Sequence, residues 1–142
     1  MWTRRDWMLA MAVLASRRAF AGDDGFVIVL HPDNPATGVD RDFLRDAFLK
    51  KATEWSDGAT IRPIDLATKF PVRDMFTHDV LRKSSAQLKN YWNQQIFSGK
   101  GIPPIEADSV AGMLEYIVAN RGAVGYLPAG ASPGRVKAVK VT

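Results

Sequence analysis

One run of five apolar residues, FVIVL at Phe26–Leu30, constrains the fold of this chain more than any other stretch. The run has the length of a β-strand and is continuous rather than alternating, which is typical of a strand buried on both faces. Such a strand needs packed structure on both sides of its sheet, and helices supply it in α/β domains. The sequence therefore predicts an α/β domain whose sheet begins at this run.

The segment after the run predicts a loop, a helix and a second strand. Residues 31–40 are dense in Pro, Asn, Asp and Gly, as loops are, and Asp40 can cap a helix that runs to about Lys51. A turn at 56–58 then leads into a strand near 61–66, in which Pro63 indicates an edge or a bulge. The apolar positions on one face of the helix are Phe43, Leu44, Ala47 and Phe48.

Three further helices and two strands follow. Pro71 suits the first position of a helix, Ser84 and Gln87 have the spacing of a capping box, and Asp108 or Ser109 begins a helix that stops at 120–122. The segments AVGYL and RVKAVKV then supply the last two strands. The expected inward positions are Val72, Met75, Phe76 and Val80 in the first helix, Leu88, Tyr91, Trp92 and Ile96 in the second, and Val110, Met113, Leu114, Ile117 and Val118 in the third.

The first 21 residues have the pattern of an export signal and are not expected to belong to the fold. Arg4 and Arg5 precede a short apolar run, and residues 19–21 form an A-x-A cleavage site. The run is shorter than the roughly 20 residues that a membrane-spanning helix needs, which argues against the alternative of an anchor. The arginine pair also resembles the twin-arginine variant of such signals. We therefore expect export to the periplasm by the twin-arginine or the general secretory route, with no stable membrane insertion of the mature domain, residues 22–142.

Composition excludes several functional classes. Without residues 1–21 the formal charge falls from +4 to +1, and no basic block remains, so nucleic acid is a poor candidate partner. The chain has no cysteine, and His31 and His78 match no metal-ligand spacing, so neither a metal nor a cofactor is expected. Residues 130–134 match G-x-S-x-G, but Pro133 has no N–H for an oxyanion hole and no histidine follows Ser132. No catalytic residue and no enzyme activity are predicted.

Several short motifs occur here in the order found in one known family. The chain contains NP at 34–35, FLK at 48–50, Trp55, DG at 57–58, PI at 63–64, Arg73 and GAVGYLP from Gly122, together with LKNYWNQQIFSGKGIPP at 88–104. In these motifs it resembles the phosphate ABC transporter substrate-binding proteins, above all their small stand-alone members. The resemblance implies a single periplasmic-binding-protein-like domain of type II, with a small mixed sheet flanked by about four helices. It also implies a small anion such as phosphate as ligand, and a transporter membrane component or a second protein subunit as partner.

One departure from that family bears on the ligand. The S-G-T that precedes the arginine in the larger members is Phe70-Pro71-Val72 here, so two hydroxyl donors and a backbone N–H are missing. Each hydrogen bond to a charged group contributes roughly 1.5 to 3 kcal/mol, so weak binding of phosphate or another small anion is expected. The alternative is a periplasmic interaction or accessory module that kept the fold without a ligand.

The candidate ligand-binding residues are Thr37, Gly38, Arg73, Ser109 and Tyr126. Arg73, in the expected first turn of a helix, is the best candidate for an anion contact, against the alternative of an ordinary surface arginine. Thr37, Gly38 and Ser109 precede helix starts, where N–H groups could face a ligand but where a turn and a cap serve equally well. Tyr126 could line a cleft or simply pack in the core.

Overall fold

The computed structural model describes residues 25–142, so the export signal predicted for residues 1–21 lies outside the described residues. The strands are β1 (Phe26–Leu30), β2 (Gly38–Val39), β3 (Arg62–Leu66), β4 (Ile105–Ala107), β5 (Ala123–Pro128) and β6 (Lys137–Val141). The helices are α2 (Arg41–Phe48), α3 (Pro71–Phe76), the π-helical turn η1 (Thr77–Leu81), α4 (Ser85–Phe97) and α5 (Val110–Ala119).

The strands form one mixed sheet in the order β2-β6-β1-β5-β3-β4. β1 is antiparallel to both of its neighbours, whereas β3 is parallel to β5 and to β4, and β2 is parallel to β6. The apolar run lies inside this sheet as β1, and Ile28, Val29 and Leu30 have no exposed surface. The predicted doubly buried strand is therefore confirmed.

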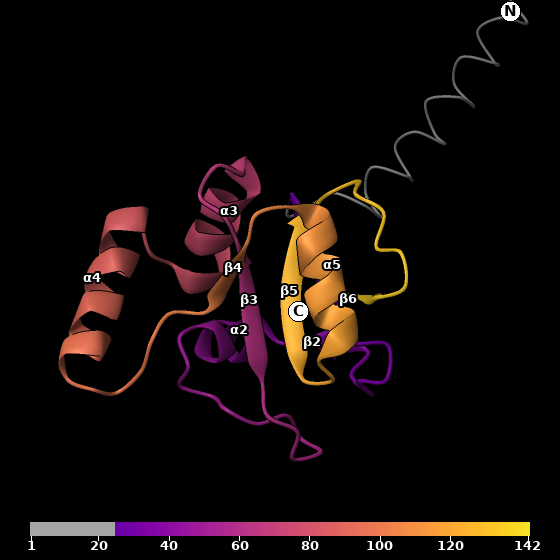
Figure 1. Ribbon diagram of the computed structural model, residues 1–142, viewed down its shortest axis with the longest axis horizontal. Coiled ribbons are helices and arrows are strands. Elements are labelled where there is room, and N and C mark those ends of the chain that lie inside the picture. The colour runs from indigo at the N-terminus through magenta and orange to yellow at the C-terminus, as the bar shows by residue number, and fades with distance from the viewer. Residues whose placement is uncertain (1–24) are drawn as a thin grey trace, which may run out of the picture.

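Neighbouring residues of β5 show that helices cover both faces of the sheet. A Cβ added to Gly125 would come within 2.8 Å of the Met113 sulfur, so α5 packs closely on that face. The next residue, Tyr126, points to the other face, where its ring stacks on Phe76 of α3 at 4.0 Å and lies 6.2 Å from Phe48 of α2. The molecule is thus a three-layer α/β/α arrangement, with α4 at one end beyond β4 (Figure 1). The predicted fold class is confirmed.

The predicted helix starts are confirmed by their caps. The Asp40 side chain accepts a hydrogen bond from the backbone of α2, and Ser109 does the same for α5. Ser84 and Gln87 form both hydrogen bonds of a capping box at the start of α4. The sequence therefore specified where these helices begin.

Several boundaries and orientations differ from the sequence predictions. α2 ends at Phe48 rather than near Lys51, because Lys50 has a left-handed backbone with φ of 61°. β3 is an interior strand rather than an edge; Pro63 is tolerated because β4 pairs with β3 only from Ile64 onward. β2 and β4 were not predicted, since two or three residues carry no readable periodicity.

Two side chains expected to face the core are exposed. Met75 in α3 is 44% exposed and Ile96 in α4 is 51% exposed. The α4 helix buries only Leu88 and Trp92, and Tyr91 is half-buried. The helices were predicted correctly from the spacing of their apolar residues, but more of these residues were expected in the core than the rest of the domain covers.

Candidate functional site

The structure brings two of the five candidate residues together. Arg73 of α3 and Tyr126 of β5 both contact Asp65, an aspartate of β3. Thr37 and Gly38 lie at the β2 edge of the sheet, opposite the β4 edge, and Gly38 pairs with β6. The Ser109 hydroxyl accepts a hydrogen bond from the Gly112 N–H, 2.9 Å away, as an N-cap.

Asp65 is the buried centre of this group, with 3% of its surface exposed. The Tyr126 hydroxyl donates a hydrogen bond to its carboxylate, and the Leu66 N–H donates to the same hydroxyl oxygen at 3.3 Å. Burial raises the pKa of Asp65, although Arg73 and Tyr126 act in the opposite direction. Burial also raises the pKa of Tyr126, and the neighbouring Asp65 carboxylate adds to that rise. Tyr126 is itself fully buried, so its side chain reaches no open surface.

Arg73 is held from three sides. Its Nε lies 3.6 Å from the Asp65 carboxylate, while its Nη1 donates to the Leu66 carbonyl at 3.0 Å and pairs with Glu106 of β4. Burial alone would lower the pKa of Arg73, but the two carboxylates raise it, and the net direction is upward. The backbone N–H of Arg73 is also occupied, because it donates to the Phe70 carbonyl at 3.0 Å. One guanidinium therefore faces two carboxylates.

Sequence reasoning missed both of these carboxylates. Asp65 could have been identified from the sequence, since it is an acidic residue within the otherwise apolar strand segment PIDL. An aspartate at such a position must be paired or hydrogen-bonded when buried, so a partner could have been sought. Glu106 left no such signal, because it lies in the strand that was not predicted.

A hollow of about 530 Å³ opens beside Arg73 and Glu106. Its walls come from α3, η1, α4 and the residues around β4, and its lining residues are Thr68, Arg73, Asp74, Thr77, Ser85, Leu88, Lys89, Trp92, Asn93, Ile96, Pro103 and Glu106. The buried hydroxyl oxygen of Thr77 has no hydrogen-bond partner, and within residues 25–142 it is the one side-chain atom of this kind. We call this space the α4 hollow.

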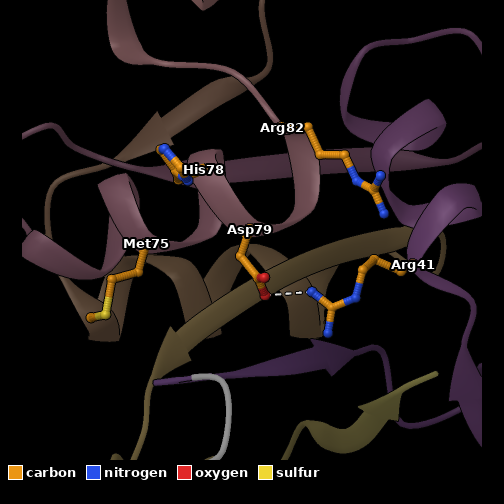
Figure 2. A pocket seen from close by; sticks show the side chains of 5 residues that line it. All are labelled: Arg41, Met75, His78, Asp79 and Arg82. Atoms are coloured by element: carbon orange, nitrogen blue, oxygen red, sulfur yellow. Dashed lines mark hydrogen bonds and ion pairs between the residues drawn. The ribbon is translucent and has the colours of Figure 1, made fainter.

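A second hollow, of about 660 Å³, lies over η1 and the start of α2 (Figure 2). It is lined by Arg41, Met75, His78, Asp79 and Arg82. Arg41 pairs with Asp79, and Figure 2 shows the Arg82 side chain extending to the side of the hollow where Arg41 lies. With two arginines against one carboxylate, this hollow is more positive than the surroundings of Arg73. No sequence motif had marked it, since its residues come from two separate segments.

Other kinds of site are absent from the part of the chain that the structure describes. Over residues 25–142, no cluster of three or more His, Cys, Asp or Glu side chains could hold a metal ion. Within the same range, none of the helices combines the length and the apolar character needed to cross a bilayer.

The three-layer fold is that of the substrate-binding proteins of phosphate ABC transporters. A chain from Clostridium perfringens, assigned as such a protein and solved with bound phosphate, matches 83% of this chain with 20% identity and a TM-score of 0.64. An ABC-type phosphate transport receptor from Vibrio cholerae matches 83% with 20% identity and a TM-score of 0.64. PstS from Borrelia burgdorferi matches 84% with 12% identity and a TM-score of 0.64. No family model matches the chain, and no curated protein sequence matches it.

These matches confirm the predicted fold and the resemblance on which it rested. They cover 45%, 46% and 47% of the three solved chains, so this chain spans under half the length of the proteins it resembles.

Proposed function

We propose that the chain is an exported, periplasmic solute-binding-like protein that binds phosphate or another small anion weakly, with Arg73 as the principal contact. The observation that carries this proposal is the position of Arg73, whose guanidinium lines the α4 hollow in a domain with the fold of phosphate-binding transport proteins. Asp65 and Tyr126 hold the guanidinium in place from behind. Thr37, Gly38 and Ser109 stand outside this group, so the proposed site centres on Arg73.

The charges around Arg73 make the proposed binding weak. Asp65 and Glu106 both pair with the single guanidinium, so an incoming anion must compete with Glu106 for it. An anion contact that water reaches contributes about 0.3 to 1 kcal/mol, whereas a dissociation constant of 1 μM needs about 8 kcal/mol. Micromolar affinity is therefore not expected. The dissociation constant should be about 1 mM or higher, and added salt should raise it further because its anions compete for the same guanidinium.

Titration calorimetry with phosphate tests the location of this site. Arg73→Ala should weaken the binding about two- to fivefold, because it removes the principal cationic contact. The matched control is Arg82→Ala, which removes an arginine from the second hollow instead and should leave the binding unchanged. Unchanged affinity in Arg73→Ala together with loss in Arg82→Ala would refute the proposed site and assign the anion to the second hollow.

A second candidate function is that of a periplasmic protein-interaction module. Its support is a group of exposed apolar side chains near α4 and β4: Ile96, Phe97, Ile102 and Ile105. Single exposed apolar residues are ordinary, but four of them within ten residues of sequence are typical of interaction sites. One of the four, Ile96, lines the α4 hollow. A transporter membrane component or a second protein subunit would be the partner.

A further inference from the structure

We propose that the surface formed by Ile96, Phe97, Ile102 and Ile105, called here the α4–β4 surface, is where a second copy of this chain docks. This inference rests on the second candidate function, that of a protein-interaction module, and names its partner. It does not require anion binding at Arg73. The two copies would meet across a two-fold axis, so that the same surface of each covers the α4 hollow of the other.

The α4 helix makes few buried contacts with the rest of its own chain, so some of its apolar side chains remain available to a partner. Of its 13 residues, only Leu88 and Trp92 are buried, and one further anchor is the Tyr91 hydroxyl, which donates to the Leu49 carbonyl at 2.8 Å. A helix of this length is marginal in water without tertiary packing. Figure 1 shows α4 at one end of the molecule, set apart from the sheet, with its connection to β4 passing along the same end.

The apolar side chains at this end of the molecule are exposed. Phe97 is 95% exposed at the last residue of α4, and Ile102 is 65% exposed in the connection to β4. Ile96 and Pro103 line the α4 hollow together with the buried Trp92, so the helix and the connection both border this hollow. An aromatic side chain covers about 150 to 250 Å² when buried, so Phe97 is well suited to fill a hollow on a partner.

The polar residues of the same segment favour an identical partner over a charged one. Residues 90–105 contain a single charged side chain, Lys100. The walls of the α4 hollow add two basic and two acidic side chains, so two copies placed face to face would meet no surplus of charge of one sign. These four are Arg73, Lys89, Asp74 and Glu106. The exposed polar groups on α4 include the amides of Asn90, Asn93 and Gln94. An amide both donates and accepts hydrogen bonds, so it can pair with its own counterpart across a two-fold axis, which a lysine or a carboxylate cannot do.

The contact has to extend beyond the four apolar side chains. A stable interface covers about 800 Å² on each partner, which is more than four apolar side chains supply. The walls of the α4 hollow, which include Ile96, and the exposed amides of α4 would therefore have to contribute. The second hollow is a poorer self-docking site, because its arginines would face the same arginines of a second copy.

Sedimentation equilibrium of the purified chain tests the inference, over protein concentrations of about 10 to 500 μM. The wild-type mass should rise toward twice the monomer mass. Phe97→Lys should weaken association at least about tenfold, because it puts like charges at the centre of the contact, while a lysine is well tolerated at a helix C-terminus. The matched control Met75→Lys changes an exposed apolar residue at the second hollow and should associate as the wild type does.

Spin labelling gives a second readout, since the chain contains no cysteine of its own. Labels at Phe97→Cys should give a short distance between copies, and labels at the exposed residue in Asp33→Cys a longer one. A monomer mass at every concentration, equal association of the wild type and Phe97→Lys, or a shorter distance from Asp33→Cys would each overturn the inference. Phosphate binding by a purely monomeric chain would do so too, while leaving the proposed function standing.

Discussion

Substituting Glu106 by glutamine should strengthen phosphate binding at Arg73. Glu106 pairs with the Arg73 guanidinium, and a bound anion would have to displace it. Its side chain is 48% exposed, so the pair is screened by water and contributes about 0.2 to 1 kcal/mol. The substitution also removes one negative charge near the bound anion, and a pair of like charges at 4 Å costs about 1 kcal/mol in water.

Together these two effects amount to about 1 to 2 kcal/mol, which corresponds to an affinity for phosphate about 5 to 30 times higher. Titration calorimetry at low ionic strength is the appropriate measurement, because salt screens both effects. Glu115→Gln is the matched control, since it removes an exposed carboxylate of α5 outside the α4 hollow and should leave the affinity unchanged. Equal or weaker phosphate binding by Glu106→Gln would refute the argument that competing carboxylates weaken this site.

Three further predictions concern stability and export. Burial raises the pKa of Asp65, so the stability linked to this group is full below about pH 4 and is lost as pH rises through its folded pKa. In denaturant titrations the free energy of unfolding of Asp65→Asn should therefore depend less on pH than that of the wild type. An unchanged pH dependence would contradict this. Gly122→Ala should lower the free energy of unfolding by at least about 3 kcal/mol, because the added Cβ would lie 1.8 Å from the Thr60 carbonyl oxygen. The control Gly101→Ala has open space around its Cβ and should change it by no more than about 0.5 kcal/mol. Equal effects in denaturant titrations would be inconsistent with this packing. The exported protein should begin at Gly22 on N-terminal sequencing, and an intact N-terminus would count against the signal.

Local sequence rules predicted the fold well because each acts over a few residues. The apolar run at 26–30 indicated a strand buried on both faces, and Ser84 with Gln87 fixed the start of α4 through a capping box. Short elements escaped the same rules. β2 and β4 owe their existence to pairing with β6 and β3, which lie far from them in the sequence.

The candidate site was less predictable because its decisive contacts are long-range. Arg73 was singled out from its place at a helix start, but its partner Glu106 is 33 residues away. Tyr126 was left open between lining a cleft and packing in the core, and only its ring contacts and its bond to Asp65 decide for the core. Met75 and Ile96 were assigned to the core by spacing alone, which cannot tell whether a covering layer exists.

The most direct test of the proposed function is a phosphate titration of the wild-type chain, followed by calorimetry at two ionic strengths. Competition with Glu106 for Arg73 predicts a dissociation constant of about 1 mM or higher, which is at most about 4 kcal/mol of binding free energy. Added salt should raise this constant further, because its anions compete for the same guanidinium. Micromolar affinity that salt leaves unchanged would contradict the account of a weak site opposed by two carboxylates.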